Sequence, residues 1–453
     1  MKKVLLATTC LMLTACTTVQ PRKATPIGMP TAYDFARENE SITEQDTVWW
    51  EHFGDPALSA LIEQALAENQ DIEAGLAAVR ASRAAVRVTN ASLYPQLSAG
   101  GSANSNSDDG LDDFSASARG TASYQLDLFG QNQASRASAT ANYESQYFNQ
   151  RTLELTISSD VAFNYFSVLT LRHRLEVAQS NLTISERINE IVKARYEAGS
   201  VSRFDLTSQE AAVANARARL PQIEQQLVSI ETALAILLGQ TPQGYAAPSG
   251  ELLAMVPPDI NPGLPSDLLL RRPDLLSAEA QLRAADADIA GARAAFFPSI
   301  DLSAGVNAGL TGGTSVLGTL ASSLSVPIFS GGRLEGQLES ANARADQQLA
   351  RYRQATLNAL RDVDVSLSAL TTAEKREVQL EIARRASDQS LQLAELRYKT
   401  GADDLTSLLN AQTTAFNAAD SLFQGRLDRL SAAIDLFVAM GGGWADAPTW
   451  ASL

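Results

Sequence analysis

Two long stretches of this chain contain neither glycine nor proline, the residues that most often interrupt helices. They span residues 131–198 and 337–400. As a single helix, at ~1.5 Å per residue, each would extend for roughly 100 Å. Along the first stretch, apolar residues such as Ile157, Val161 and Leu182 recur at the spacing of a coiled-coil seam. The pattern favours one very elongated body over two or three ordinary domains.

The ends of the two stretches read alike, which indicates an internal duplication. "ARYEAGSVSRFDLTSQEAAVANA" in the first half and "LRYKTGADDLTSLLNAQTTAFNA" in the second align without gaps and share the motif R-Y-x-x-G. The glycines of the motif, Gly199 and Gly401, suit the left-handed turn that ends many helices. A second helical segment follows each turn, at 205–238 and 405–440. We therefore expect two helical hairpins with their turns at these glycines.

Each half also contains two short segments in which apolar and polar residues alternate. They predict strands at about 94–105 and 115–128, and at about 297–309 and 317–328. This length suits tilted strands of an outer membrane, although a soluble hairpin alternates in the same way. Four strands cannot close a barrel, and open strand edges cannot lie in lipid. Membrane strands would have to be pooled between subunits, and a trimer would supply twelve.

The N-terminus has the pattern of a lipoprotein secretion signal. Lys2 and Lys3 precede the apolar run "VLLATTCLML", and "LTAC" follows with Cys16 at its end. The run is too short for a transmembrane helix, and cleavage before Cys16 would leave its thiol for attachment of a lipid such as palmitate. Cys10 matches the signal less well, and an ordinary signal with an incidental cysteine is the alternative. Thr17 follows where an aspartate would retain the protein at an inner membrane.

These signals divide the chain into six segments. The linker between the two repeats is rich in proline and glycine, as connecting segments are. We expect a signal peptide at 1–15, an N-terminal anchor segment at 16–48, a first repeat at 49–238, a linker at 239–272, a second repeat at 273–440 and a C-terminal tail at 441–453.

Composition excludes several classes of function. The formal net charge of −15 argues against nucleic-acid binding, which needs a basic surface. After removal of the signal, Cys16 is the only cysteine, and His52 and His173 are the only histidines. A metal site, a cofactor motif or a catalytic triad is difficult to build from this set. We therefore expect a protein without cofactor that is not an enzyme.

The chain resembles the TolC-type outer-membrane efflux channels, in particular the lipoprotein subgroup that works with RND pumps. The resemblance covers nearly the whole mature chain and includes "WWEHFGDPALSALIEQALAENQDIEAGLAAVRASRAAVR", "LPSDLLLRRPDLLSAEAQLRAADADIAGARAAFFPSI", "PIFSGGR" and both R-Y-x-x-G turns. It implies an α+β membrane protein with an internal tandem repeat. Four strands per protomer would be pooled into a trimeric, twelve-stranded β-barrel among outer-membrane lipids, above a long α-helical coiled-coil barrel in the periplasm.

The resemblance also implies passive export and two partner proteins. An inner-membrane RND-type transporter would supply the energy, and a periplasmic membrane-fusion adaptor would join it to the homotrimer. The helical turns would form the periplasmic tip, where the adaptor docks and the channel closes. The residues implied at the docking tip are Arg195, Tyr196, Gly199, Arg397, Tyr398 and Gly401, and those implied at the gate are Asp205, Asp403, Asp404 and Tyr398.

One residue of the implied gate departs from the family pattern. In the family, an aspartate placed like Asp205 bonds to a tyrosine like Tyr398, and a basic residue follows the second turn. Asp403 occupies that basic position here. Clustered carboxylates repel unless they are paired, so we expect a nearby arginine (195, 203 or 397) to supply the counter-charge. In a trimer each of these carboxylates would be repeated three times around the axis, and a ring of this kind would also attract cations.

Two other classes of protein remain as alternatives. A periplasmic coiled-coil adaptor or scaffold lipoprotein without a pore would share the long helices and the lipid anchor. It would lack the paired strands at corresponding places in both halves. A secreted hydrolase would need a catalytic constellation that the composition does not provide.

Overall fold

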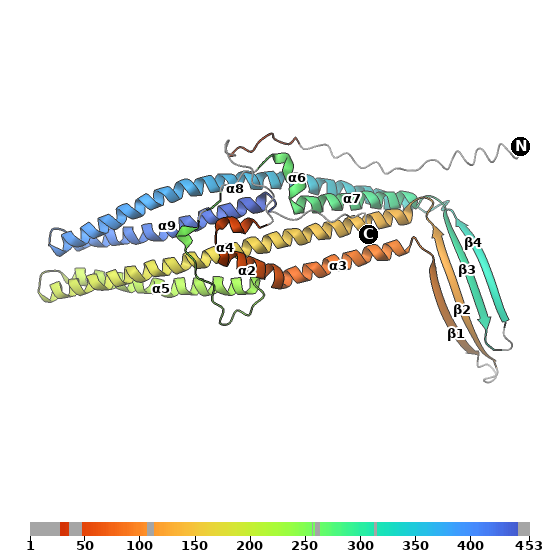
Figure 1. The fold of residues 1–453 in the computed structure, drawn as a ribbon, viewed down its shortest axis with the longest axis horizontal. Helices are drawn as coiled ribbons and strands as arrows, with labels where there is room; N and C mark the ends of the chain where they lie inside the picture. The colour runs from red at the N-terminus through yellow and green to blue at the C-terminus, as the bar shows by residue number, and fades with distance from the viewer. Residues whose placement is uncertain are drawn as a thin grey trace.

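The computed structural model describes residues 28–35, 48–106, 113–255, 257–258, 263–311 and 315–442. The expected signal peptide and Cys16 lie outside the described residues. The molecule is elongated, with a four-stranded sheet at one end and the turns of two helical hairpins at the other (Figure 1). No helix in this part of the chain is both long enough and apolar enough to cross a membrane.

The two halves contain the same elements in the same order, so the expected tandem duplication is present. The corresponding helices have equal lengths: 22 residues for α3 and α7, 67 for α4 and α8, and 35 for α5 and α9. At ~1.5 Å per residue, the longest pair extends for roughly 100 Å. The first half comprises η1 (Trp49–Phe53), α2 (Pro56–Glu68), α3 (Gln70–Ala91), β1 (Gln96–Asn106), β2 (Asp113–Leu126), α4 (Gln131–Glu197) and α5 (Arg203–Leu237).

The linker and the second half continue the chain. Three short helices, two of the 3-10 type and one α, mark the linker: η2 (Leu252–Ala254), η3 (Pro265–Asp267) and α6 (Leu268–Arg271). The second half then comprises α7 (Pro273–Ala294), β3 (Ser299–Gly309), β4 (Ser315–Ser325), α8 (Arg333–Lys399) and α9 (Leu405–Ala439).

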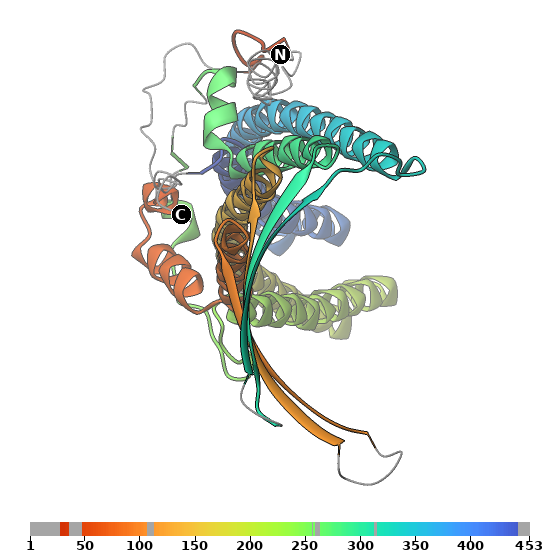
Figure 2. The same ribbon diagram turned by 90° about the vertical axis from the view of Figure 1, so that its right-hand side faces the viewer.

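The four strands form one antiparallel sheet in the order β1-β2-β3-β4. The pairing of β2 with β3 joins the two repeats, with Thr121 opposite Gly305. The sheet is curved and extends away from the helical body (Figure 2). Among the residues that the structure describes in one protomer, no strand pairs with the outer edges of β1 and β4.

The strands end earlier at the helical side than the sequence pattern predicted. β2 ends at Leu126 rather than 128, because the backbone N–H of Leu128 bonds back to the carbonyl of Leu126 at 3.0 Å. β4 ends at Ser325 rather than 328, since Pro327 has no N–H for a ladder bond. Alternation alone does not reveal these local stops.

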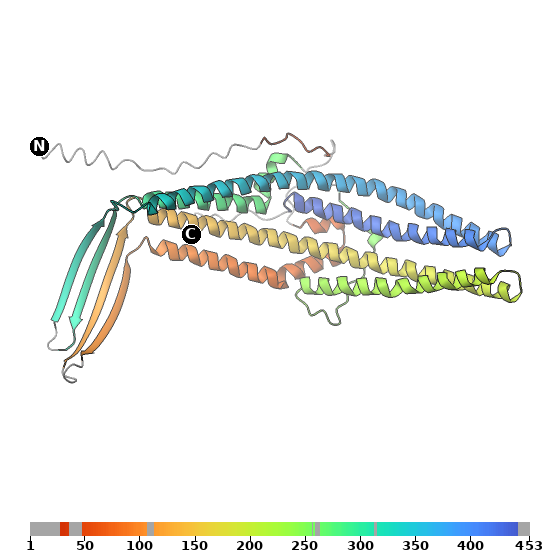
Figure 3. The ribbon, with the colours of Figure 1, turned by 180° about the vertical axis from the view of Figure 1, so that it is seen from behind.

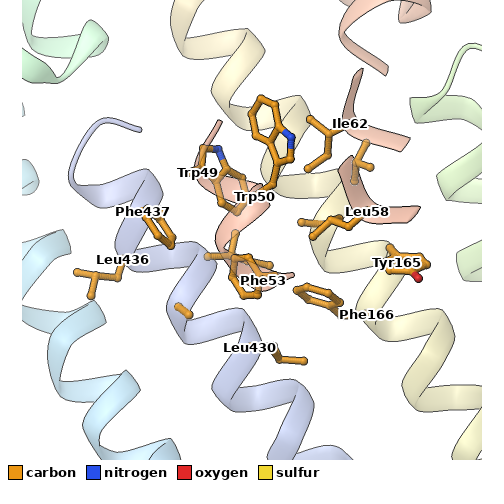
Figure 4. Close-up of a cluster of buried hydrophobic side chains, with 14 of the residues drawn as sticks. Trp49, Trp50, Phe53, Leu58, Ile62, Tyr165, Phe166, Leu430, Leu436 and Phe437 are labelled. Carbon is orange, nitrogen blue, oxygen red and sulfur yellow. The ribbon is translucent and has the colours of Figure 1, made fainter. Parts of the chain in front are cut away.

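The largest apolar core among the described residues lies where η1, at the start of the first repeat, packs against helices of both repeats (Figure 4). Trp49 is only 1% exposed, and its ring centroid lies 5.5 Å from that of Phe437 on α9. Phe53 lies 5.3 Å from Phe166 on α4. Buried aromatic side chains contribute large apolar areas to stability, so these residues of η1 fasten the first long helix to the last helix.

Candidate functional site: the tip of the paired helical hairpins

The turns of the two hairpins lie at the same end of the molecule, far from the sheet (Figure 3). In the first turn, Gly199 adopts φ of 71°. Its N–H bonds to the carbonyl of Tyr196 at 2.9 Å, and the N–H of Ser200 bonds to the carbonyl of Arg195 at 2.9 Å. This pair of bonds is a Schellman cap, which satisfies the last carbonyls of a helix and favours glycine at the left-handed position.

The second turn repeats this cap. Gly401 has φ of 75°, its N–H bonds to the carbonyl of Tyr398 at 3.1 Å, and the N–H of Ala402 bonds to the carbonyl of Arg397 at 2.8 Å. The R-Y-x-x-G motif therefore marks the ends of α4 and α8. A Cβ added to either glycine would meet no other atom of the described protomer within 4 Å.

A contact between Arg195 and Tyr398 joins the two turns. The Arg195 guanidinium lies over the Tyr398 ring, 4.5 Å from its centroid. It also donates to the backbone carbonyls of Tyr398 at 3.0 Å and Lys399 at 3.3 Å. The Tyr398 ring is buried in a small apolar cluster that includes Ile188 and Leu408. A cation stacked on a buried ring contributes about 1 kcal/mol or more, so this contact connects the two hairpins of one protomer.

The equivalent arginine of the second repeat has a different partner. Arg397 forms an ion pair with Asp403 at 3.4 Å, within its own turn. A further ion pair, Arg187 to Glu395 at 2.7 Å, connects α4 with α8 above the tip. The duplicated motif thus supplies one arginine to the joint between hairpins and one to the local charge balance.

The three acidic residues of the implied gate all bind nearby backbone groups. Asp205 accepts from the backbone N–H of Ser202 at 2.9 Å and from its hydroxyl at 2.7 Å, and forms a capping box at the start of α5. Asp404 accepts from the N–H of Ser407 at 2.8 Å, which caps α9 and lowers the pKa of the Asp404 carboxyl. Asp403 accepts from the N–H of Asp404 at 3.0 Å.

The geometry brings together some of the expected site residues and leaves others apart. Within one protomer, Asp205 does not bond to Tyr398, and the Tyr398 hydroxyl has no hydrogen-bond partner among the described residues. Arg397 supplies the counter-charge that we expected for Asp403. The Ser202 cap was not predicted from the sequence, although the spacing S-x-x-D in "SRFD" is a recognisable capping-box signal.

The fold and the tip together define a class of protein. Two helical hairpins with a shared tip, below a sheet whose open edges need partner strands, form the protomer of a TolC-type channel. Such channels are trimers, and three copies of this sheet supply a twelve-stranded barrel. The chain belongs to the outer membrane efflux protein family, whose profile matches residues 61–240 and 264–442, one match for each repeat.

Named relatives and solved structures agree with this assignment. The chain is 34% identical to the pyoverdine export outer membrane protein OpmQ of Pseudomonas aeruginosa, over 98% of this chain and 97% of OpmQ. It is 30% identical to SilC of Salmonella typhimurium, a probable outer membrane lipoprotein, over 98% and 99%. The outer-membrane channel OprN superposes with a TM-score of 0.85 at 27% identity, covering 94% of this chain and 99% of OprN. The open MtrE channel of Neisseria gonorrhoeae superposes with a TM-score of 0.83 at 29% identity, covering 94% of this chain and 98% of MtrE.

The protein is therefore an outer-membrane efflux channel and not an enzyme. The family assignment also excludes the alternative of a pore-free adaptor or scaffold. The protein provides an exit across the outer membrane as part of a tripartite efflux system.

Proposed function

We propose that the joint tip of the hairpins docks onto a periplasmic membrane-fusion adaptor, which is fed by an inner-membrane RND-type transporter. The observation that carries this proposal is the contact between Arg195 and Tyr398, which holds the two glycine turns together as one surface. Gly199 and Gly401 are exposed and present no side chain of their own, and no other part of the protomer lies within 4 Å of where a Cβ would stand. A partner backbone can approach closely at such positions.

Export by a strain that lacks its own outer-membrane channel tests this function. The strain is supplied with this chain, and the neighbouring adaptor and transporter genes are present or absent. We expect export to return only when all three components are present. Export that persists without the transporter would contradict the proposed pathway.

We further propose that Cys16 is lipidated and anchors the mature N-terminus in the inner leaflet of the outer membrane. Mass spectrometry of the mature N-terminal peptide should find acyl chains on Cys16. A Cys16→Ala variant should still form trimers, because one lipid group adds limited affinity beside a membrane-spanning barrel. An unmodified cysteine in the wild type would refute the anchor.

We infer that Asp403 and Asp404 form an acidic constriction at the tip of the trimer. Asp403→Asn combined with Asp404→Asn removes both carboxylates and leaves the charge of Arg397 without its partner, so cation selectivity in planar bilayers should weaken. Asparagine can still cap α9, so the turn should keep its structure. The hydrogen bonds from Ser407 lower the pKa of the Asp404 carboxyl, so this carboxylate stays charged further into the acidic range. We therefore expect Asp404 to maintain part of the wild-type cation selectivity at mildly acidic pH.

A control variant separates the tip from the remaining acidic surface. Glu224→Gln removes an exposed carboxylate from α5, away from the turns, and should leave selectivity unchanged. If the double asparagine variant conducts cations as the wild type does, the constriction lies elsewhere.

A further inference from the structure

The register of the sheet separates polar from apolar residues with few exceptions. In β2, alternate residues on one face are serine, arginine, threonine and glutamine, and the other face presents phenylalanine, alanine, tyrosine and leucine. The pairing continues this division across β3, where Asp301 lies opposite Gln125 and Leu302 lies opposite Tyr124. In an outer-membrane barrel the apolar face contacts lipid and the polar face lines the lumen. The polar face, which carries Arg119 and Asp301, is therefore the wall of the exit.

Charged residues are rare on this wall. Among the strand residues whose side chains the structure describes, two are charged: Arg119 in the middle of β2 and Asp301 near the start of β3. β1 and β4, whose open edges meet between neighbouring protomers, contain none. No ion pair joins Arg119 to another described residue, and no neighbouring strand in the trimer offers a carboxylate beside it.

The surroundings of Arg119 leave its side chain free to reach into the lumen. Its neighbours across the sheet are Gly100 on β1 and Asn307 on β3, so no bulky or anionic group lies directly beside it. Arg119 is exposed in the protomer. Twelve strands spaced ~4.8 Å apart and tilted by ~40° enclose a barrel with a backbone radius of roughly 12 Å. Since a Debye length is ~8–10 Å at 0.1–0.15 M salt, a solute on the axis feels all three guanidinium groups at once.

The carboxylate of Asp301 acts at a separate level of the barrel. Arg119 is level with Asn307, and Asp301 lies six residues closer to the helices along β3, a separation of ~20 Å. That distance is about two Debye lengths at 0.1 M salt. An outgoing solute therefore passes Asp301 before it reaches Arg119. At this distance the Asp301 carboxylates do not neutralise the charge of the Arg119 side chains.

We propose that the three Arg119 side chains of the trimer form a cationic ring in the barrel that binds solutes carrying several carboxylate or phosphate groups. Guanidinium groups bind such oxyanions through paired hydrogen bonds as well as charge. Anionic cargo would bind to the ring on its way out of the channel, and anions that enter the barrel from outside would bind to the same three arginines. This inference deepens the exit-channel function and rests on it.

Citrate, a trivalent anion, is a suitable probe. Trimers in detergent are titrated with citrate by calorimetry, and the same trimers are studied in planar bilayers with citrate on the side of the barrel opening. We expect one citrate per trimer and a partial block of the current. Arg119→Gln should weaken binding at least about tenfold, because all three charge-assisted contacts are lost. Both effects should diminish as the salt concentration rises.

Matched variants distinguish the ring from general electrostatics. Arg119→Lys keeps the charge but loses the planar fork, so it should bind citrate with intermediate affinity. Asp301→Asn should not weaken binding. If Arg119→Gln conducts normally and binds citrate as the wild type does, the ring is not a site and the channel function stands. If this chain does not restore export when the adaptor and the transporter are both present, the exit-channel function and this inference fall together.

Discussion

Export should be lost when Gly199 or Gly401 is replaced by tryptophan, while trimers still assemble in the outer membrane. Each glycine ends a long helix in the left-handed conformation, with φ of 71° and 75°. A non-glycine residue there costs about 1–2 kcal/mol. A Cβ at either position would meet no other atom of the protomer within 4 Å, and both glycines are exposed, so we expect the indole to project from the tip toward the adaptor. Efflux of a transported dye, together with the trimer band in outer-membrane fractions, measures both properties.

Two further substitutions separate strain from bulk. Gly199→Ala imposes the same backbone strain without a large side chain, and should retain much of the export. Gly244→Trp places an indole on another exposed glycine with positive φ and open space around it, but in the linker. It should export normally. Normal export by Gly199→Trp, or an equal defect in Gly244→Trp, would contradict docking at the tip.

The long helices and their turns could be predicted from sequence because their causes are local. The absence of glycine and proline over 131–198 and 337–400 agrees with α4 and α8. The R-Y-x-x-G motif marked both caps because a Schellman turn needs glycine at one position. Strand alternation was sufficient to identify four strands. Because four strands cannot close a barrel, their number indicated that subunits pool their strands.

The contacts that join the repeats could not be predicted in the same way. Arg195 and Tyr398 are 203 residues apart in sequence, and nothing in the motif distinguishes Arg195, which stacks on that tyrosine, from Arg397, which does not. Likewise, "WWEHF" supplied a family resemblance but gave no sign that Trp49 packs against Phe437. Such contacts depend on how the helices are placed around the core, and a single sequence does not encode that placement in any short pattern.

Two arginines fasten the linker between the repeats, and they differ in burial. Arg172 on α4 donates to the carbonyls of Ala247 at 2.7 Å and Pro248 at 2.9 Å, and its ion pair with Glu231 is partly exposed. Arg426 on α9 donates to the carbonyl of Leu253 at 3.1 Å and to that of Met255.

The ion pair of Arg426 is the more buried of the two. Its guanidinium lies 2.8 Å from the Glu377 carboxylate, with side chains 9% and 5% exposed. Arg429 contacts the same carboxylate at 3.0 Å. A charge at this depth is costly unless it is paired, so Arg426 serves both the linker and Glu377.

Arg426→Met should therefore destabilise the protomer far more than Arg172→Met. Removing one partner of a buried ion pair costs roughly 3–5 kcal/mol. We expect the lower end of this range, because Arg429 still contacts Glu377. At the partly exposed Arg172 the loss should be only about 1 kcal/mol. Heat-induced dissociation of purified trimers, and the rate at which a protease cleaves the linker, measure the difference.

A double variant identifies the buried charge as the cause. Arg426→Met combined with Glu377→Leu removes both partners, and replacing a buried pair by apolar side chains is often neutral. It should therefore recover part of the thermal stability that Arg426→Met loses. It should not restore the protection of the linker, since the carbonyls of Leu253 and Met255 still lack their donor. If the double variant is no more stable than Arg426→Met, the loss arises from the linker contacts and not from the buried carboxylate of Glu377 that has lost a partner.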